Sequence, residues 1–418
     1  MKQKKKQQKN LLGRTVTAIA ASSAVLLSMV CSTLIGMPDS ANASSAGLAR
    51  YSIEGFASAR QVTGGGIVKE GDATYHKVST PEQFLHALST VKKTKSSAVI
   101  EIANDLALGS KELGSALTTY KNVIEPAKNQ ALLHPTLKKT GVSMINIKEM
   151  NNLTIYSKTG AKLTHACFNI SNSQNIMIRN LTFDEIWEWD EQTSGDYDRN
   201  DWDCITAQNG VTGLWIDHCT FYKAYDGIID VKKATDTTTS DVTISYCKFL
   251  PGSEGNFVEE MMELLEAEPE RYPYYYSLVS TYGMTKEQVR GYANAQKKTH
   301  LIGASDSEAN MKNLRITLAN NYYKNSMDRM PRMRAGVAHV YNCIMDSSEL
   351  YTLRNSVKNQ KAKSKIVSNG SISTVGAKVF LQNDKIDGIV NALISGNGNS
   401  AAGEIGIRPR DIPCRTSI

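Results

Sequence analysis

The chain has 418 residues, of which 41% are hydrophobic and 21% are charged, so it is long enough to bury a large core. Beyond the N-terminus no apolar run approaches the length that spans a bilayer. The formal net charge is +7, but residues 1–43 carry six basic residues and one acidic residue; the remainder therefore has a net charge of +2, which gives no indication of a nucleic-acid partner.

The first 43 residues have the pattern of a secretory signal peptide. Residues 1–10 are basic, an apolar stretch follows from about Val16 to Ile35, and Ala41-Asn42-Ala43 provides a small-residue cleavage site. A single membrane anchor is the alternative. We expect residues 1–43 to be removed and residues 44–418 to be a secreted, extracellular, monomeric domain without membrane attachment.

The first predicted element after the signal peptide is a helix that begins at Thr80. Thr80 is a favourable N-cap, Pro81 suits the first helical position, and the helical pattern continues through Leu88. Repeat folds need capped ends. This helix is therefore predicted to cap the repeat that follows.

Short apolar triplets, most of them β-branched, recur through the middle of the chain and predict stacked strands. The third residues of successive triplets are 23 or more residues apart, and a second apolar group follows most triplets. Because residues i and i+2 of a strand share a face, these positions can stack coil on coil into one core. The triplets are 153–155, 176–178, 214–216, 242–244, Leu314–Ile316 and 338–340, and the second groups are 181–183, 219–221, 247–249 and 321–323.

This repeat predicts an all-β fold, a single-stranded right-handed parallel β-helix with an N-terminal capping helix and a helical insertion. A β-sandwich is the alternative, but variable loop lengths around a fixed strand repeat argue against it. Cys219 and Cys247 hold equivalent places in the second groups, so we expect buried, stacked thiols there. Secretion permits disulfides among the cysteines that remain after loss of Cys31.

Two segments interrupt or end the repeat. Residues 252–297 form an insertion in which Phe257 to Glu268 and Lys286 to Ala295 are predicted helices, with a tyrosine-rich stretch between them. The insertion is predicted to be either a lid over a groove or a self-packed surface element. From about residue 395 to residue 418 no strand repeat is visible, and we expect an irregular tail.

Three aspartates are predicted to lie in register on adjacent coils. Asp226 and Asp230 are four residues apart in a predicted strand, so their side chains point to one face. Asp203 precedes the strand at Leu214 by about the length of a coil turn. Three carboxylates on one face form a hard oxygen site, and such a site suits Ca²⁺.

A second motif is basic. Arg329 and Arg334 bracket Pro331 in the segment RMPRMR, and Lys298 precedes the segment LIGASDS. Planar guanidinium groups bind carboxylates bidentately, which favours an acidic ligand. The alternative is structural ion pairing with the acidic segment from Asp184 to Asp203.

Together, the segment LWIDHCTFYKAYDGIID and the segment RMPRMR resemble the signature of family 1 polysaccharide lyases, the pectate lyases. Gly55-Phe56-Ala57 and residues 63–66 also resemble the start of mature members, so the resemblance covers about residues 51–345. It implies a calcium-dependent carbon–oxygen lyase that cleaves α-1,4-linked polygalacturonate by β-elimination to 4,5-unsaturated oligogalacturonides. The residue roles that it implies are calcium ligands at Asp203, Asp226 and Asp230, the catalytic base at Arg329, and substrate binding at Lys298 and Arg334.

Three other functions share this fold class. A pectin lyase would cleave methyl-esterified pectin without calcium and would lack the acidic trio. A hydrolase of the polygalacturonase type would use clustered aspartates and a water molecule, and no paired-aspartate motif of that kind is visible. A non-catalytic β-helix that binds glycans would keep the coils without needing Arg329.

Overall fold

The computed structural model describes residues 53–109, 143–187, 189–191, 193–196, 201–252, 257–396 and 398–408. The predicted signal peptide lies outside these ranges, as do residues 409–418 of the predicted tail. None of the helices in these ranges is long and apolar enough to cross a membrane.

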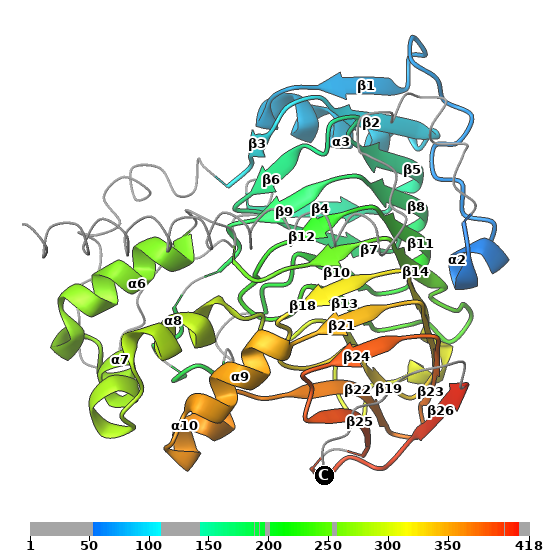
Figure 1. Ribbon diagram of the computed structural model, residues 1–418. Helices are drawn as coiled ribbons and strands as arrows, with labels where there is room; N and C mark the ends of the chain where they lie inside the picture. Colours follow the sequence, from blue (N-terminus) through cyan, green and yellow to red (C-terminus); the bar gives the residue numbers. More distant parts are fainter. Residues whose placement is uncertain are drawn as a thin grey trace, which may run out of the picture. The chain divides into compact units, whose positions relative to one another are not determined.

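Three parallel sheets, here named A, B and C, contain the strands of the described chain (Figure 1). Sheet A has ten strands: β1 Tyr75–Val78, β2 Ala98–Ile102, β5 Asn151–Tyr156, β8 Gln174–Arg179, β11 Thr212–Asp217, β14 Val242–Ser245, β17 Arg315–Ala319, β20 Val337–Tyr341, β23 Lys378–Gln382 and β26 Glu404–Arg408. Sheet B has eight: β3 Leu106–Ala107, β6 Lys162–Thr164, β9 Thr182–Asp184, β12 Thr220–Phe221, β15 Lys248–Phe249, β18 Tyr322–Lys324, β21 Ile344–Asp346 and β24 Lys385–Asp387. Sheet C has eight: β4 Met144–Lys148, β7 Cys167–Ser171, β10 Ile205–Gln208, β13 Ile229–Lys232, β16 Leu301–Ile302, β19 Arg332–Arg334, β22 Asn369–Thr374 and β25 Asn391–Ser395.

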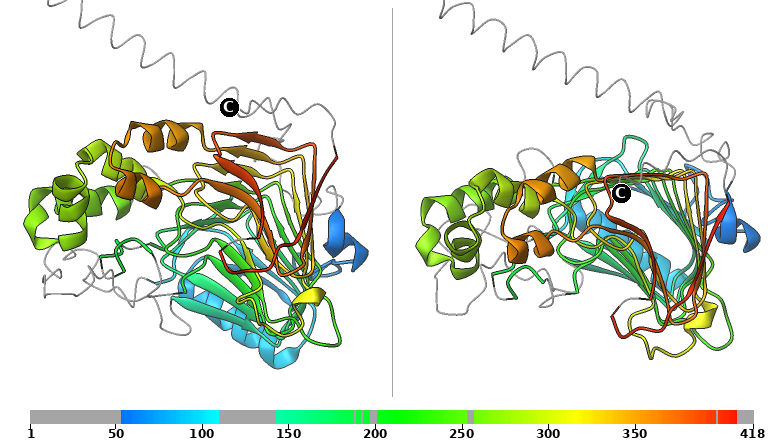
Figure 2. Two further views of the ribbon diagram at one scale, coloured as in Figure 1. Left: turned by 90° about the horizontal axis from the view of Figure 1, so that it is seen from below. Right: turned by 60° about the horizontal axis from the view of Figure 1, so that its bottom comes forward.

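The chain visits the sheets in the repeating order A, B, C, so each coil contributes one strand to each sheet. Leu153 pairs with Ile176, which is one coil of 23 residues further on, and Ile176 pairs with Leu214. The two views in Figure 2 show the coils stacked on one another. This arrangement confirms the predicted parallel β-helix.

The predicted strand groups align as expected, with one exception. Val242 pairs with Ile316 rather than with Leu314, so the triplet placed at Leu314–Ile316 belongs two residues later. Both Leu314 and Ile316 are fully buried, which is why the sequence pattern alone did not separate them. The shift is an even number of residues, and the predicted inward face is therefore unchanged.

Aromatic rings stack along the inside of sheet B and join successive coils. Phe183 and Phe221 stack at 4.9 Å between ring centroids, Phe221 and Phe249 at 5.3 Å, and Phe249 and Tyr323 at 4.7 Å. All of these rings are fully buried, so each coil covers the apolar surface of the next. The buried ladder fixes the register of the coils that carry the candidate site.

The cysteines within the described ranges are free thiols. Cys219 and Cys247 are fully buried at adjacent corners of the coils, as predicted, and each thiol donates to a backbone carbonyl of its own coil. Burial raises the pKa of Cys247 well above its usual value, so this thiol is a packing group.

The predicted capping helix is confirmed and is longer than expected. It is α3, Pro81–Thr94, and the Thr80 side chain accepts a hydrogen bond from the backbone of Gln83. Its apolar face covers the first coils, because Phe84 stacks against Phe168. The other helices are α2 Gly55–Ala59, α6 Phe257–Ala267, η3 Pro269–Arg271, α7 Pro273–Tyr276, the π-helical turn η4 Ser277–Thr281, α8 Lys286–Asn294, η5 Met311–Asn313, α9 Ser348–Ser356 and α10 Gln360–Lys365.

The helical insertion forms between β15 and β16, as predicted, with α6 and α8 as its main helices. Helix α8 packs against both α6 and α9 (Figure 2). Three of the insertion's tyrosine rings, Tyr272, Tyr274 and Tyr275, are buried, and Tyr274 stacks on Trp189 at 5.2 Å. The insertion is therefore packed through buried aromatic rings, which join the same hydrophobic core as Trp189 and the β-helix.

Strand β26 lies in the segment where we expected no strand. Its five residues, Glu404 to Arg408, pair in register with β23. Ile405 and Ile407 alternate around Gly406, which weakens the strand pattern in the sequence. The β-helix thus continues for one more coil than predicted.

Candidate metal and substrate site

The candidate site lies on the outer face of sheet C. Ile229 and Val231 of β13 point into the core, so Asp230 and Lys232 point outward. Asp226 lies in the bend before β13, so the prediction that Asp226 and Asp230 share a strand is wrong. Asp203 lies just before β10, which pairs with β13.

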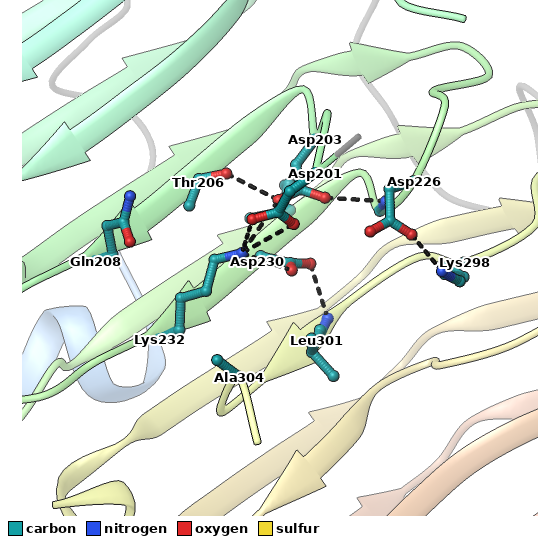
Figure 3. A network of polar contacts seen from close by, with 12 residues as sticks. Asp201, Asp203, Thr206, Gln208, Asp226, Asp230, Lys232, Lys298, Leu301 and Ala304 are labelled. Atoms are coloured by element: carbon teal, nitrogen blue, oxygen red, sulfur yellow. Dashed lines mark hydrogen bonds and ion pairs between the residues drawn. The ribbon is translucent and has the colours of Figure 1, made fainter. Parts of the chain in front are cut away.

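Backbone and hydroxyl donors hold two of the three predicted aspartates (Figure 3). The Asp203 carboxylate accepts hydrogen bonds from the Gly227 backbone at 2.9 Å and from the Thr206 hydroxyl at 2.8 Å. The Asp230 carboxylate accepts one from the Leu301 backbone at 3.1 Å. Asp203 and Asp230 are each only 1% exposed, so their orientation is fixed by burial as well as by these bonds.

Gly227 explains why the chain bends at this point. A β-carbon at this position would lie 2.6 Å from Oδ1 of Asp230 and 2.7 Å from Oδ1 of Asp203. Such contacts are too short for any residue with a side chain. The absent side chain lets the Asp226 bend pass close to both carboxylates.

The structure adds two residues that the sequence analysis did not assign. Carboxylate oxygens of Asp201, Asp203 and Asp226 lie within 4.8 Å of one another. The Lys232 ammonium lies 2.9 Å from Asp201, 3.4 Å from Asp230 and 3.7 Å from Asp203. Period-2 spacing was the available signal, because Asp201 is two residues before Asp203 and Lys232 is two residues after Asp230.

Burial and mutual repulsion shift the pKa values in this cluster. Burial raises the pKa of Asp203 well above its usual value, and the neighbouring charge of Asp230 raises it further. Burial raises the pKa of Asp230 to about 6, although the positive charges of Lys232 and Arg329 lower it. Burial lowers the pKa of Lys232, but the charges of the surrounding aspartates outweigh burial and raise it overall. The cluster therefore concentrates negative charge that its own cations only partly balance.

The donor set fits a calcium ion. Ca²⁺ takes oxygen ligands at about 2.3–2.6 Å, so two ligand oxygens on opposite sides of one ion are roughly 5 Å apart. One carboxylate oxygen from each of Asp201, Asp203 and Asp226 lies within 4.8 Å of the other two, so the three oxygens are close enough to bind one ion. Four carboxylates face the ammonium groups of Lys232 and Lys298 and the guanidinium of Arg329, so negative charge is in excess at this site.

Lys298 joins the predicted metal site to the predicted substrate site. Its ammonium lies 2.6 Å from Oδ1 of Asp226, and both side chains are mostly buried. Lys298 lies three residues before β16 and follows the insertion directly. The sequence analysis placed these two residues in separate motifs, and the fold brings them into contact.

Arg329 lies in the turn before β19 with a backbone φ of 69°, which is uncommon for a residue with a side chain. Its side chain is 15% exposed, and its Nε lies 3.7 Å from the Asp328 carboxylate, too far for a direct hydrogen bond. That buried Nε has no hydrogen-bond partner among the described residues. Among the residues that the structure describes, the guanidinium therefore has no bidentate carboxylate pair of the kind that is common for arginine.

Arg334, on β19, is held more firmly than Arg329. Its Nε donates to Asp306 at 2.7 Å, and its Nη1 donates to the carbonyl oxygens of Gly303 at 2.6 Å and Ala304 at 3.3 Å. Asp306 is a partner that the sequence analysis did not assign. Arg332 lies on the same strand face, and burial together with the charges of Arg334 and Arg329 lowers its pKa.

His218, in the first motif, has a packing role. Its ring stacks on Tyr246 at 4.9 Å, and its Nδ1 lies 2.7 Å from the Asp217 carboxylate. Asp217 is fully buried and also pairs with Arg179. These residues belong to sheet A and its following turn, whereas the candidate site is on sheet C.

The sequence matches the family model described as pectate lyase over residues 23–255 and 289–404. The stretch between the two matched parts lies within the helical insertion, so the insertion is an addition to the family's common core. The match covers more than half of the chain.

Known proteins of the same family resemble the chain over most of its length. Pectate lyase B of Paenibacillus amylolyticus is 44% identical over 366 residues, covering 85% of this chain and 90% of that protein. The solved pectate lyase of Paenibacillus sp. 0602 is 40% identical with a TM-score of 0.73, covering 85% of this chain and 81% of that one. A Bacillus subtilis pectate lyase mutant, 20% identical with a TM-score of 0.52 and covering 86% and 87%, shares the fold. The chain therefore belongs to the pectate lyase family, a family of polysaccharide lyases.

Proposed function

We propose that this chain is a secreted, calcium-dependent pectate lyase that cleaves α-1,4-linked polygalacturonate by β-elimination to 4,5-unsaturated oligogalacturonides. The observation that carries the proposal is the carboxylate cluster, with Asp203 and Asp230 buried, beside Lys298 and Arg329. The relative named pectate lyase B supports the substrate class. The N-terminal pattern supports secretion, and we expect a monomer.

In this proposal Asp203, Asp226 and Asp230 bind Ca²⁺, with Asp201 as a fourth carboxylate. The buried pair Asp203 and Asp230 supplies a fixed part of the site, and the bend that carries Asp226 supplies the part nearest to Lys298. When bound by these carboxylates, Ca²⁺ would act as a Lewis acid toward the carboxylate of the substrate. Neutralising the substrate carboxylate in this way makes the adjacent carbon more acidic.

The chain's own basic residues complete the reaction. In its neutral form Arg329 takes the proton from C5, the electron pair of that C–H bond forms the C4=C5 double bond, and the glycosidic oxygen leaves C4 with the electron pair of the C4–O bond and takes a proton from solvent water. Arginine is normally protonated and is therefore an unusual base. The lack of a bidentate carboxylate partner supports this role, because such a pair would hold the guanidinium in its protonated form.

Lys298 and Arg334 bind the substrate in this proposal. Lys298 is next to Asp226 and is therefore beside the proposed calcium ion. Arg334 is anchored by Gly303 and Asp306, and its side chain keeps 11% of its surface exposed, so a uronate carboxylate would bind the guanidinium from the solvent side. A planar guanidinium suits that carboxylate.

Substitutions at the two arginines test the assignment of roles. Arg329→Lys should lose turnover almost as completely as Arg329→Ala, because lysine does not reproduce the planar group or its placement. Arg334→Lys should mainly raise KM, because a point charge still attracts a carboxylate. Calcium affinity, measured by calorimetry, should be retained in all three variants and controls for misfolding. Near-native turnover of Arg329→Ala would remove Arg329 from the mechanism.

A further inference from the structure

Gln296 is a fully buried amide at the junction of the helical insertion and the candidate site. It lies two residues after the end of α8 and two residues before Lys298. Its Oε1 accepts a hydrogen bond from the Ala224 backbone at 2.9 Å. Its Nε2 donates to the backbone carbonyl of Asp226 at 3.1 Å and also to that of Lys298. The Gln296 side chain thus links the segment that carries Asp226 to the backbone of Lys298.

The backbone of Gln296 reaches a third loop. Its N–H donates to the Asn325 carbonyl at 3.2 Å, and its carbonyl accepts from the Met327 backbone at 2.9 Å. Met327 is two residues before Arg329. The three segments that carry Asp226, Lys298 and Arg329 therefore all hydrogen-bond to this one residue.

The Asp226 bend needs support from a side chain because it lacks strand pairing. On one side, the backbone N–H of Asp226 donates to the Trp202 carbonyl at 3.1 Å. On the other side, the Asp226 carbonyl accepts from Gln296. Without the Gln296 amide, this carbonyl and the Ala224 N–H would lose a partner inside the protein, which is costly for buried groups.

A buried lysine strengthens the same junction. The Lys223 ammonium donates to the carbonyl of Ala295 at 2.6 Å and lies 5.3 Å from the ring centroid of Trp187. Lys223 and Ala224, in the segment that leads to Asp226, thus hydrogen-bond to Ala295 and Gln296 at the end of the insertion. The insertion, which lies largely outside the family model, is attached to the site at this point.

We propose that Gln296 is a positioning residue that holds the Asp226 bend against the Lys298 segment and so sets the affinity for Ca²⁺. The inference rests on the proposed function, because it concerns the metal assigned there. Outer residues that orient metal ligands typically change metal affinity by about 10–100-fold when they are replaced. A purely structural amide would affect stability alone.

The test compares Gln296→Met with a matched control in full-length protein. Methionine fills a similar volume but cannot make any of the three side-chain hydrogen bonds. Asn321 is the control, because it is also fully buried and its side chain bonds the backbone of Cys247 and Ile244 at 2.9 Å, at the corner between sheets A and B. Calcium affinity is measured by calorimetry without substrate, and stability by thermal unfolding in chelator.

Gln296→Met should bind Ca²⁺ at least about tenfold more weakly than the wild type. Asn321→Leu should lose comparable stability and keep the wild-type affinity. Gln296→Asn provides a second variant if Gln296→Met does not fold: it keeps an amide but is too short to reach all three partners, so its affinity should also fall. Wild-type affinity in the folded Gln296 variants would overturn the inference. A wild type that binds no Ca²⁺ would overturn the proposed function as well.

Discussion

The contact between Lys298 and Asp226 joins a proposed substrate residue to a proposed metal ligand at 2.6 Å. Lys298→Met should raise KM for polygalacturonate, because a cation next to the substrate is lost. The same variant should bind Ca²⁺ about fivefold more tightly, which corresponds to ~1 kcal/mol for release of a partly buried ion pair. Steady-state kinetics and calorimetry measure the two effects separately. Weaker calcium binding would instead mean that Lys298 orients Asp226 for the metal.

The buried carboxylate of Asp384 lies at a corner of a coil, and it makes the stability of the protein depend on pH. It occupies the corner position that Asn321 has two coils earlier, and its carboxylate accepts from the Cys343 backbone at 2.7 Å. Burial raises the pKa of Asp384 to about 7. This value lies above the unfolded value of about 3.9, so the wild type loses stability as pH rises from about 4 through 7.

Asp384→Asn should therefore be more stable than the wild type at pH 8, by about 1 kcal/mol or more, and the difference should shrink at pH 5. Urea unfolding at the two pH values measures this change. Exposed Asp387, on the adjacent strand, is the control, and Asp387→Asn should have little effect at either pH. An equal loss of stability at both pH values for Asp384→Asn would show that the hydrogen-bond geometry matters more than the charge.

Some residues of the candidate site were predicted from the sequence, and others were identified only from their contacts in the structure. Asp203, Asp226 and Asp230 were named from carboxylate spacing and family resemblance. The structure clusters Asp203 and Asp226 with Asp201 and places Asp230 next to Asp203, and their role as metal ligands stays a prediction. Lys232 and Gln296 were not found, because their importance comes from contacts between segments. Gln296 reaches residues that are about 30 to 70 positions away in the chain, and no local pattern marks such a residue.

At the scale of elements, the sequence patterns predicted the helices of the insertion but not how its side chains pack. Its two main helices were predicted within one residue of their observed ends, since helical periodicity and the capping sequence at Thr285 are local signals. The burial of its tyrosine rings was left open, because the same residues suit either an aromatic core or a sugar-binding face. The structure favours the aromatic core.

Tyr275 tests the role of the insertion. Its ring is 1% exposed and packs edge-on against Trp189 at 6.3 Å, so Tyr275→Ala should destabilise the protein by about 3 kcal/mol or more. KM should stay unchanged at saturating calcium and low temperature. Tyr276, which is 44% exposed, should tolerate alanine in both measurements. A raised KM with an unchanged melting temperature in either variant would support a sugar-binding lid.

At the scale of the whole molecule, the sequence repeat predicted the fold, because strands that stack in a β-helix place apolar residues at regular intervals along the chain. The first triplet after the insertion was placed two residues early, because Leu314 and Ile316 are both buried and the long insertion removes the constraint of a fixed coil length. Strand β26 was missed because a short edge strand with a central glycine has a weak pattern. The sheet order determines which strands lie side by side, and so brings the acidic and basic motifs to one face.

The central claim is that the acidic cluster and the adjacent cations act together in calcium-dependent elimination. The most direct measurement is the release of UV-absorbing unsaturated ends from polygalacturonate, followed as free Ca²⁺ is raised from excess chelator to saturation. We predict no product in chelator, full recovery with calcium, and little product from highly methyl-esterified pectin. Undiminished product in excess chelator would contradict the account and favour a calcium-independent pectin lyase.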